Sequence, residues 1–184
     1  GYGQPKGARG ILKLPAGLIQ PRGSISFKIT PGWKTDFAEL DSSIQLFSTP
    51  SVTNGGMFQI YVYVHSRGNY ALGLHVYTNE IGSETLCGHS AMYAIKRAAV
   101  GSGNSLFKTS LWKKGEPRTI RVSWSPSQLI ISENGRRMAV RDLAPELDLS
   151  SFSGPLFVGS NASRRLARVI LKDIEIRGSG RASK

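Results

Sequence analysis

The segment Arg118–Asp142, RTIRVSWSPSQLIISENGRRMAVRD, decides the fold class of this chain. Ile120, Val122 and Trp124 occupy alternate positions in its first part, which is the pattern of a strand with one buried face. The pair Asn134-Gly135 is typical of a tight hairpin turn between two such strands. The segment therefore predicts a meander of antiparallel strands.

The same alternation assigns faces to the meander. Leu129 and Ile131 are expected on the side of Trp124, in the core. The polar positions between the apolar ones include three arginines. We predict that these form one basic stripe that faces the solvent and binds sulphated or uronate polymers, consisting of Arg121, Arg137 and Arg141.

Short apolar or alternating segments separated by Gly, Pro, Asn and Ser recur along the rest of the chain, whereas helical periodicity is almost absent. The sequence thus predicts an all-β fold of two packed antiparallel sheets with little helix. The predicted strands are Gly10–Leu14, Ser24–Thr30, Ser43–Ser48, Met57–Ser66, Tyr70–Thr78, Ser105–Ser110, Arg118–Ser125, Gln128–Glu133, Arg137–Asp142, Pro155–Gly159 and Val169–Arg177. A weak helix or turn is expected at Ser90–Ala99 and a single turn at Leu147–Phe152.

The hairpin Met57–Thr78 predicts a candidate ligand-binding face. A three-residue loop, Arg67–Asn69, would place Val64 opposite Leu72 and Val62 opposite Leu74, so that the apolar rows share one face. The other face then carries aromatic and hydrogen-bonding side chains. They are Gln59, Tyr61, Tyr63, His65, His75 and Tyr77. Such side chains stack on sugar rings and bond their hydroxyls.

Length and charge limit the organisation and the partners. A chain of 184 residues is sufficient for one domain, which we expect at residues 10–177, between a flexible segment at 1–9 and a flexible basic tail at 178–184. Lys and Arg number 24 against 12 Asp and Glu, so the net charge is +12. A surplus of this size favours polyanionic partners. The apolar runs are too short for a transmembrane segment, and Cys87, as the only cysteine, excludes an internal disulfide.

Five segments, in this order along the chain, resemble the laminin-G-like domains of the concanavalin A-like jelly-roll superfamily. They are Gly23–Trp33, Trp112–Ser125, Leu129–Gly135, Leu156–Ser160 and Leu171–Ile176. The resemblance implies a jelly-roll sandwich and a carbohydrate-binding function. Two departures weaken the calcium site that some relatives have: Lys172 stands where an acidic residue is frequent, and Glu133 where an apolar one is usual.

Catalytic and metal sites have little support in the sequence. The paired glutamates of retaining glucanases are absent, Asp173 and Glu175 belong to a structural closing strand, and Cys87 is interpreted as an inert thiol in a loop. We predict no cofactor; the acidic group Asp36, Glu39 and Asp41 is the one candidate for calcium.

The resulting prediction is a non-catalytic, lectin-like module for an acidic or sulphated glycan, with an extracellular, cell-surface or periplasmic location. Two alternatives stay open. A polysaccharide lyase would use the Tyr and His residues of the hairpin to move protons in β-elimination on a uronate polymer. A structural or protein-interaction role would apply if residues 79–104 cover that face. Nucleic acid is a weaker candidate, because no recognition motif is present.

Overall fold

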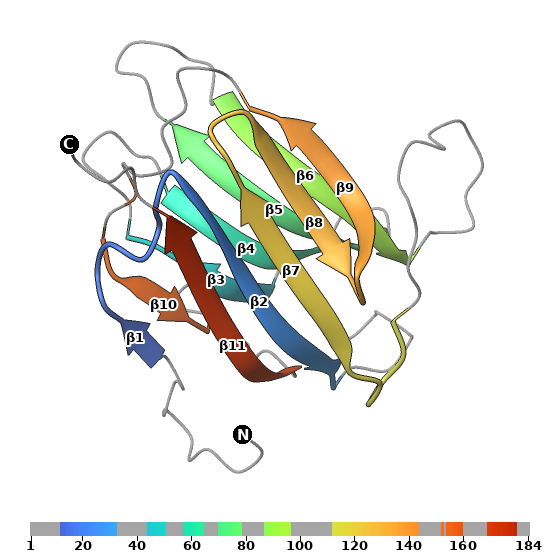
Figure 1. The fold of residues 1–184 in the computed structure, drawn as a ribbon. Helices are drawn as coiled ribbons and strands as arrows, with labels where there is room; N and C mark the ends of the chain where they lie inside the picture. Colours follow the sequence, from blue (N-terminus) through green and yellow to red (C-terminus); the bar gives the residue numbers. More distant parts are fainter. Residues whose placement is uncertain are drawn as a thin grey trace, which may run out of the picture.

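The protein is a sandwich of two antiparallel sheets, seen here in a computed structural model that describes residues 12–32, 44–50, 57–64, 70–78, 87–96, 112–143, 152, 154–159 and 169–179. Figure 1 shows the five-stranded sheet in front of the six-stranded one. The front sheet has the order β11 (Val169–Ser179), β2 (Arg22–Pro31), β7 (Arg118–Trp124), β8 (Gln128–Glu133) and β9 (Arg136–Asp142). The rear sheet has the order β1 (Leu12–Leu14), β10 (Leu156–Val158), β3 (Ile44–Ser48), β4 (Met57–Val64), β5 (Tyr70–Thr78) and β6 (Cys87–Lys96).

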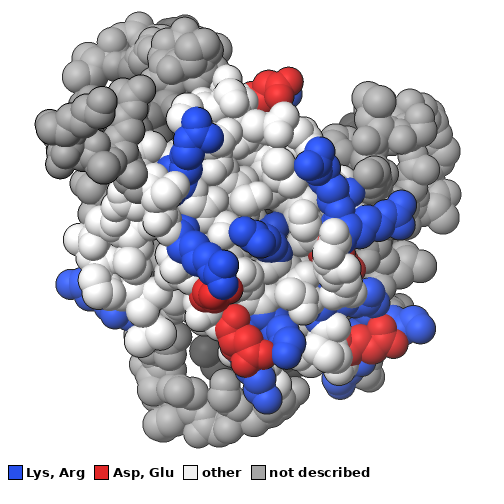
Figure 2. Space-filling model, viewed as in Figure 1, with Lys and Arg blue, Asp and Glu red and all other residues white. Residues whose placement is uncertain are grey.

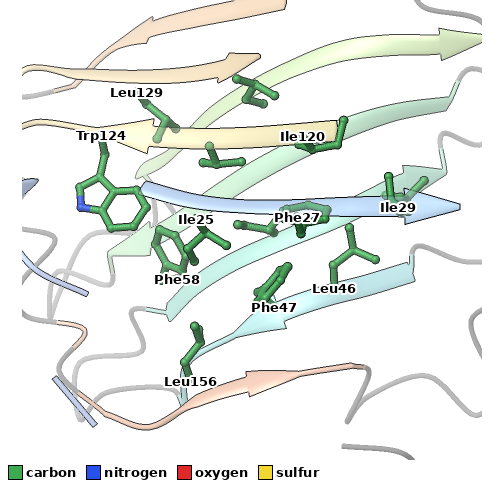
Figure 3. Packing of buried hydrophobic residues seen from close by; sticks show 14 of the residues in the cluster. Ile25, Phe27, Ile29, Leu46, Phe47, Phe58, Ile120, Trp124, Leu129 and Leu156 are labelled. Carbon is green, nitrogen blue, oxygen red and sulfur yellow. The ribbon is translucent and has the colours of Figure 1, made fainter. Parts of the chain in front are cut away.

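Apolar side chains at alternate strand positions fill the space between the sheets. On β2, β7 and β8 the buried positions alternate with more exposed ones, as the sequence pattern predicts. Phe27 from the front sheet packs on Phe47 from the rear sheet with ring centroids 5.0 Å apart. Phe58 meets the Trp124 indole edge-on at 5.4 Å, as Figure 3 shows. These contacts join the two sheets into one core.

The fold class predicted from the sequence is confirmed. Ten of the eleven predicted strands are present, with ends that differ by at most two residues, and Ser105–Ser110 lies outside the described residues. β11 continues through Gly178 and Ser179, which the sequence analysis placed in the basic tail. Phe152 is the one described residue of the predicted turn Leu147–Phe152, and it is buried in the core.

The weak helix or turn predicted at Ser90–Ala99 is wrong. Cys87–Lys96 forms β6, which pairs with β5 along its length, so Cys87 begins a strand and does not lie in a loop. Ala and Met favour helices by only a fraction of a kcal/mol per residue. The backbone hydrogen bonds offered by the open edge of β5 outweigh so small a preference.

The predicted register of the β4–β5 hairpin is wrong by two residues. Val62 is the Cα partner of Leu72 and not of Leu74, and Tyr61 lies opposite Gly73, because five residues separate the paired Val64 and Tyr70 instead of three. A shift by an even number still pairs the same alternate positions. The apolar pattern determines which face of the hairpin each residue occupies. Loops that differ by two residues place the same residues on the same face, so the pattern does not distinguish them.

Asn134 and Gly135 form the predicted tight turn between β8 and β9. Their φ angles are 49° and 79°, the left-handed values that a two-residue hairpin requires at both positions. The Asn134 side-chain oxygen accepts a hydrogen bond of 2.9 Å from the Thr119 amide, and the Asn134 amide donates to the Thr119 carbonyl at 2.8 Å. The turn is thereby tied to β7.

Candidate functional site

The residues predicted to bind ligand divide between the two sheets and do not form one site. Gln59, Tyr61 and Tyr63 belong to β4, and His75 and Tyr77 to β5, all in the rear sheet; His65 lies outside the described residues. The arginines belong to β7 and β9 of the front sheet. Side chains on the two outer surfaces point in opposite directions across the core. One ligand therefore cannot contact both groups over their sheet faces.

On the outer face of the rear sheet, Tyr61 and Ser48 are buried, whereas Gln45 and Gln59 are partly exposed. Tyr61 lies opposite Gln45 on β3, and Gln59 lies opposite Ser48. Tyr61 exposes 7% of its surface and Ser48 5%, while the Gln45 side-chain oxygen is buried without a hydrogen-bond partner. Tyr61 thus does not present an open ring face for stacking on a sugar.

The outer face of the front sheet is open and basic. Arg121 on β7 is the Cα partner of Ser132 on β8, and Ser132 is the partner of Arg137 on β9. Both arginines are exposed, which confirms that they face the solvent. Figure 2, viewed from this side, shows Lys and Arg side chains spread over the face, with Asp or Glu beside some of them. We call Arg121, Ser132 and Arg137 the basic row.

Arg141 does not belong to the basic row, which corrects the predicted stripe. A register shift between Ile131 and Ser132 changes the alternation along β9, so that Arg141 pairs with the buried Leu129. Val140 pairs with Ile130 on the outer face and is 45% exposed. Arg141 stays in contact with solvent because β9 is the edge strand. A bulge of one residue cannot be detected from alternation alone.

Local contacts hold the Arg121 side chain over the sheet. Its Nη2 atom lies 3.4 Å from the Ser24 hydroxyl oxygen on β2, to which it donates a long hydrogen bond. Among the described residues, no carboxylate pairs with Arg121. Its positive charge is therefore available to a ligand. Sequence reasoning missed Ser24 and Ser132; their outward positions in the alternating pattern were the available signal.

On the β11 side of the same face, two of the cations, Lys28 and Arg177, are paired with carboxylates. Asp173 lies 2.7 Å from the Lys28 ammonium, and Glu175 receives two hydrogen bonds from Arg177, at 2.6 and 2.8 Å. The hydrogen bond from Lys28 and its positive charge lower the pKa of the Asp173 carboxyl. Asp173 and Glu175 are thus each paired with a cation, and both belong to the strand β11 that was predicted to close the fold.

Glu133, which departs from the pattern of the family that the chain resembles, is a buried residue that connects two segments at one end of the sandwich. Its Oε2 atom accepts a hydrogen bond from the Trp112 indole at 3.1 Å, and its Oε1 atom one from Arg118 at 3.3 Å. Glu116 binds the same guanidinium at 3.0 Å from outside. Because the Trp112 and Arg118 side chains donate hydrogen bonds to its oxygens, a carboxylate is tolerated at this buried position, where an apolar side chain was expected.

Metal and membrane sites gain no support from the described residues. The acidic group Asp36, Glu39 and Asp41 lies outside them, and within them no three His, Cys, Asp or Glu side chains come together as metal ligands would. The described part of the chain also contains no helix with the length and apolar character needed to cross a membrane.

The comparison with solved structures identifies the fold. The chain superposes on the enzymatically active domain of tailspike protein 2 of bacteriophage CBA120 with a TM-score of 0.56 and 13% identity, and the match covers 90% of this chain and 23% of that chain. Mouse laminin α1 domains LG4-5 give 0.55 at 13% identity, covering 92% of this chain and 38% of theirs. Domain 4 of AbnA, a GH43 extracellular arabinanase from Geobacillus stearothermophilus solved with arabinotriose, gives 0.51 at 14% identity, covering 90% and 65%.

These likenesses show that the chain has the jelly-roll sandwich fold of these proteins, which is the fold that the resemblance to concanavalin A-like domains implied. The chain spans less than two thirds of the length of each of these three proteins. No protein-family model and no curated protein matches its sequence.

Proposed function

We propose that this domain is a carbohydrate-binding module whose ligand is an anionic polysaccharide, held on the outer face of the front sheet. The observation that carries the proposal is the basic row, in which two exposed arginines flank a serine on three adjacent strands. Guanidinium groups bind carboxylate and sulphate oxygens with two parallel hydrogen bonds, and serine hydroxyls bond sugar hydroxyls. The arabinotriose complex of a domain with the same fold supports a glycan as the ligand class.

The distribution of charge supports an anionic ligand over a neutral one. The front face carries Arg121 without a carboxylate partner, and it lacks exposed aromatic rings among its described residues, so stacking does not supply the binding energy there. Binding energy on this face comes from ion pairing and hydrogen bonding. Polysaccharides of this type occur outside cells and at their surfaces, and we propose an extracellular, cell-surface or periplasmic location on that ground.

The test is calorimetric titration of the whole chain with heparin and with alginate, using dextran as the neutral control. We expect binding to the anionic polymers and none to dextran. The affinity should fall steeply between about 50 and 300 mM NaCl, because exposed charges more than about 8–10 Å apart are screened at physiological ionic strength. Absence of binding to every anionic polymer at low salt would overturn the proposal.

Two further readouts separate the alternatives. A rise in the absorbance of unsaturated uronate during incubation with alginate would show β-elimination, and the function would then be that of a lyase. Tighter binding of a mixed-sequence oligonucleotide than of heparin at the same salt would indicate nucleic acid as the partner. Either result would refute a non-catalytic glycan-binding module.

A further inference from the structure

We infer that the anionic chain crosses the strands along the basic row and that its acid groups alternate with uncharged sugar rings. This inference rests on the proposed function, and it specifies where the polymer lies and how its charges are spaced.

The direction follows from the register. Arg121, Ser132 and Arg137 are consecutive Cα partners, so a line through them runs perpendicular to the strands. Along β7 the outward neighbours of Arg121 are Thr119 and Ser123, which carry no charge. A polymer that followed the strand would meet one cation, whereas one that crosses the strands meets two.

The spacing follows from the geometry of the sheet. Neighbouring strands lie about 4.7–4.9 Å apart, so the Cα atoms of Arg121 and Arg137 are separated by about 9–10 Å. The Arg121 guanidinium leans away from Arg137, toward Ser24 on β2, so this Cα separation does not overstate the distance between the two cations. Ser132 lies between them and offers a hydroxyl, which suits an uncharged unit of the ligand. The row therefore fits a glycan in which a neutral ring lies between successive carboxylates or sulphates. It fits a glycan with an acid on every ring less well.

A carboxylate limits the site at one end. The same row continues from Arg121 to Ser26 on β2 and then to Glu175 on β11. Glu175 repels an anionic chain and holds Arg177 with hydrogen bonds of 2.6 and 2.8 Å. The polymer therefore occupies β7, β8 and β9 and stops before β11.

The experiment compares four variants that each remove one positive charge from the same face. Arg121→Gln and Arg137→Gln change the basic row, while Arg22→Gln and Lys172→Gln are exposed controls outside it. Heparin is the probe at about 50 mM NaCl, and circular dichroism checks folding. We expect about a 3- to 10-fold loss of affinity for the row variants and less than about 2-fold for the controls. Equal losses for all four would overturn the row as the site while leaving the proposed function standing.

A gain-of-affinity variant tests the limit at β11. Glu175→Gln should tighten heparin binding by about 2- to 5-fold, because it removes the repulsion and releases Arg177. Asp142→Asn, which makes the same change in net charge on the edge strand β9, is the matched control and should have a smaller effect. An equal gain in both variants would show that only the net charge matters, and it would refute the boundary.

Two oligosaccharides test the charge spacing. Hyaluronan carries a carboxylate on every second ring and polygalacturonate on every ring, and fragments with equal numbers of carboxylates are compared at the same salt. A diffuse positive field favours the denser charge of polygalacturonate. The basic row predicts the opposite order, with hyaluronan the tighter ligand. Tighter binding of polygalacturonate would overturn the alternating ligand.

Discussion

The Trp112 indole donates a 3.1 Å hydrogen bond to the carboxylate of Glu133, and both side chains are at least 96% buried. Arg118 holds the other carboxylate oxygen. The three residues fasten the segment before β7 to the end of β8, which lies next to β7 in the same sheet. This end of the core therefore depends on a charge being matched by two donors, not on apolar contact alone.

Removing that charge should destabilise the domain. Glu133→Ala leaves the Trp112 N–H and the Arg118 guanidinium without this acceptor, so we expect the free energy of unfolding to fall by about 2–4 kcal/mol. Glu116→Ala, which removes the exposed partner of the same arginine, should cost less than about 1 kcal/mol. Urea denaturation measures both. Similar losses in the two variants would contradict the anchoring role of Glu133.

Gly23 and Gly178 are Cα partners on β2 and β11, yet we predict unequal tolerance of alanine. A Cβ atom at Gly23 would lie 2.6 Å from Cζ2 of Trp124 and 2.7 Å from the Arg177 carbonyl oxygen, and neither group can move freely. At Gly178 the nearest atoms are Cγ and Cβ of Gln20, at 2.6 and 3.0 Å. Rotation of the side chain moves Cγ away, and the contact with Cβ needs a shift of only a few tenths of an ångström. Thermal unfolding should show a loss of about 1–3 kcal/mol for Gly23→Ala and a smaller loss for Gly178→Ala. The reverse order would be inconsistent with this packing.

The hydrogen bond between Asn134 and Thr119 can be measured without disturbing the turn. Glycine accepts the positive φ of this position, so Asn134→Gly removes mainly the bond to the Thr119 amide. We expect a loss of about 0.5–1.5 kcal/mol in urea denaturation. Asn134→Asp keeps an acceptor oxygen and serves as the control. If both variants are as stable as the wild type, the side-chain bond does not contribute.

The ion pair between Lys28 and Asp173 gives a prediction for pH. Because the pKa of Asp173 is lowered in the folded protein, its contribution to stability is present above the unfolded-state pKa, about 3.9. That contribution is lost as the pH falls through the lower, folded-state pKa. Carboxyl-carbon NMR should show Asp173 titrating below the usual range, and Lys28→Met should move its pKa upward. A pKa of Asp173 that Lys28→Met leaves unchanged would assign the shift to another cause.

The sequence predicted the two-sheet fold because alternation is strong on β2, β7 and β8, where one face is buried against the core. It failed at β6, whose strand conformation depends on pairing with β5 and not on its own composition. Propensities act locally, and a strand partner more than ten residues away is invisible to them.

The site could be predicted only in part for a similar reason. Arg121 and Arg137 were correctly placed on the solvent side, but Arg141 was misplaced by the bulge in β9. The sequence also did not show that the two candidate groups belong to different sheets, since alternation assigns faces within a sheet and does not say which sheet a strand joins. The order of the strands determines which sheet each strand joins, and this order arises from contacts between residues that are distant in sequence.

β11 is an eleven-residue strand at the edge of the front sheet, where its outer backbone groups have no strand partner among the described residues. Such an edge is a template on which another copy of the chain could add a strand and begin to aggregate. The bulge between Lys172 and Glu175, with Asp173 at a φ of 51°, breaks the regular spacing of those groups. Four charged side chains around the bulge add a cost of desolvation to any added strand. They are Lys172, Asp173, Glu175 and Arg177, whereas Ile174 and Ile176 pack partly against the core. We therefore expect the irregularity that holds Asp173 against Lys28 also to oppose polymerisation through this edge.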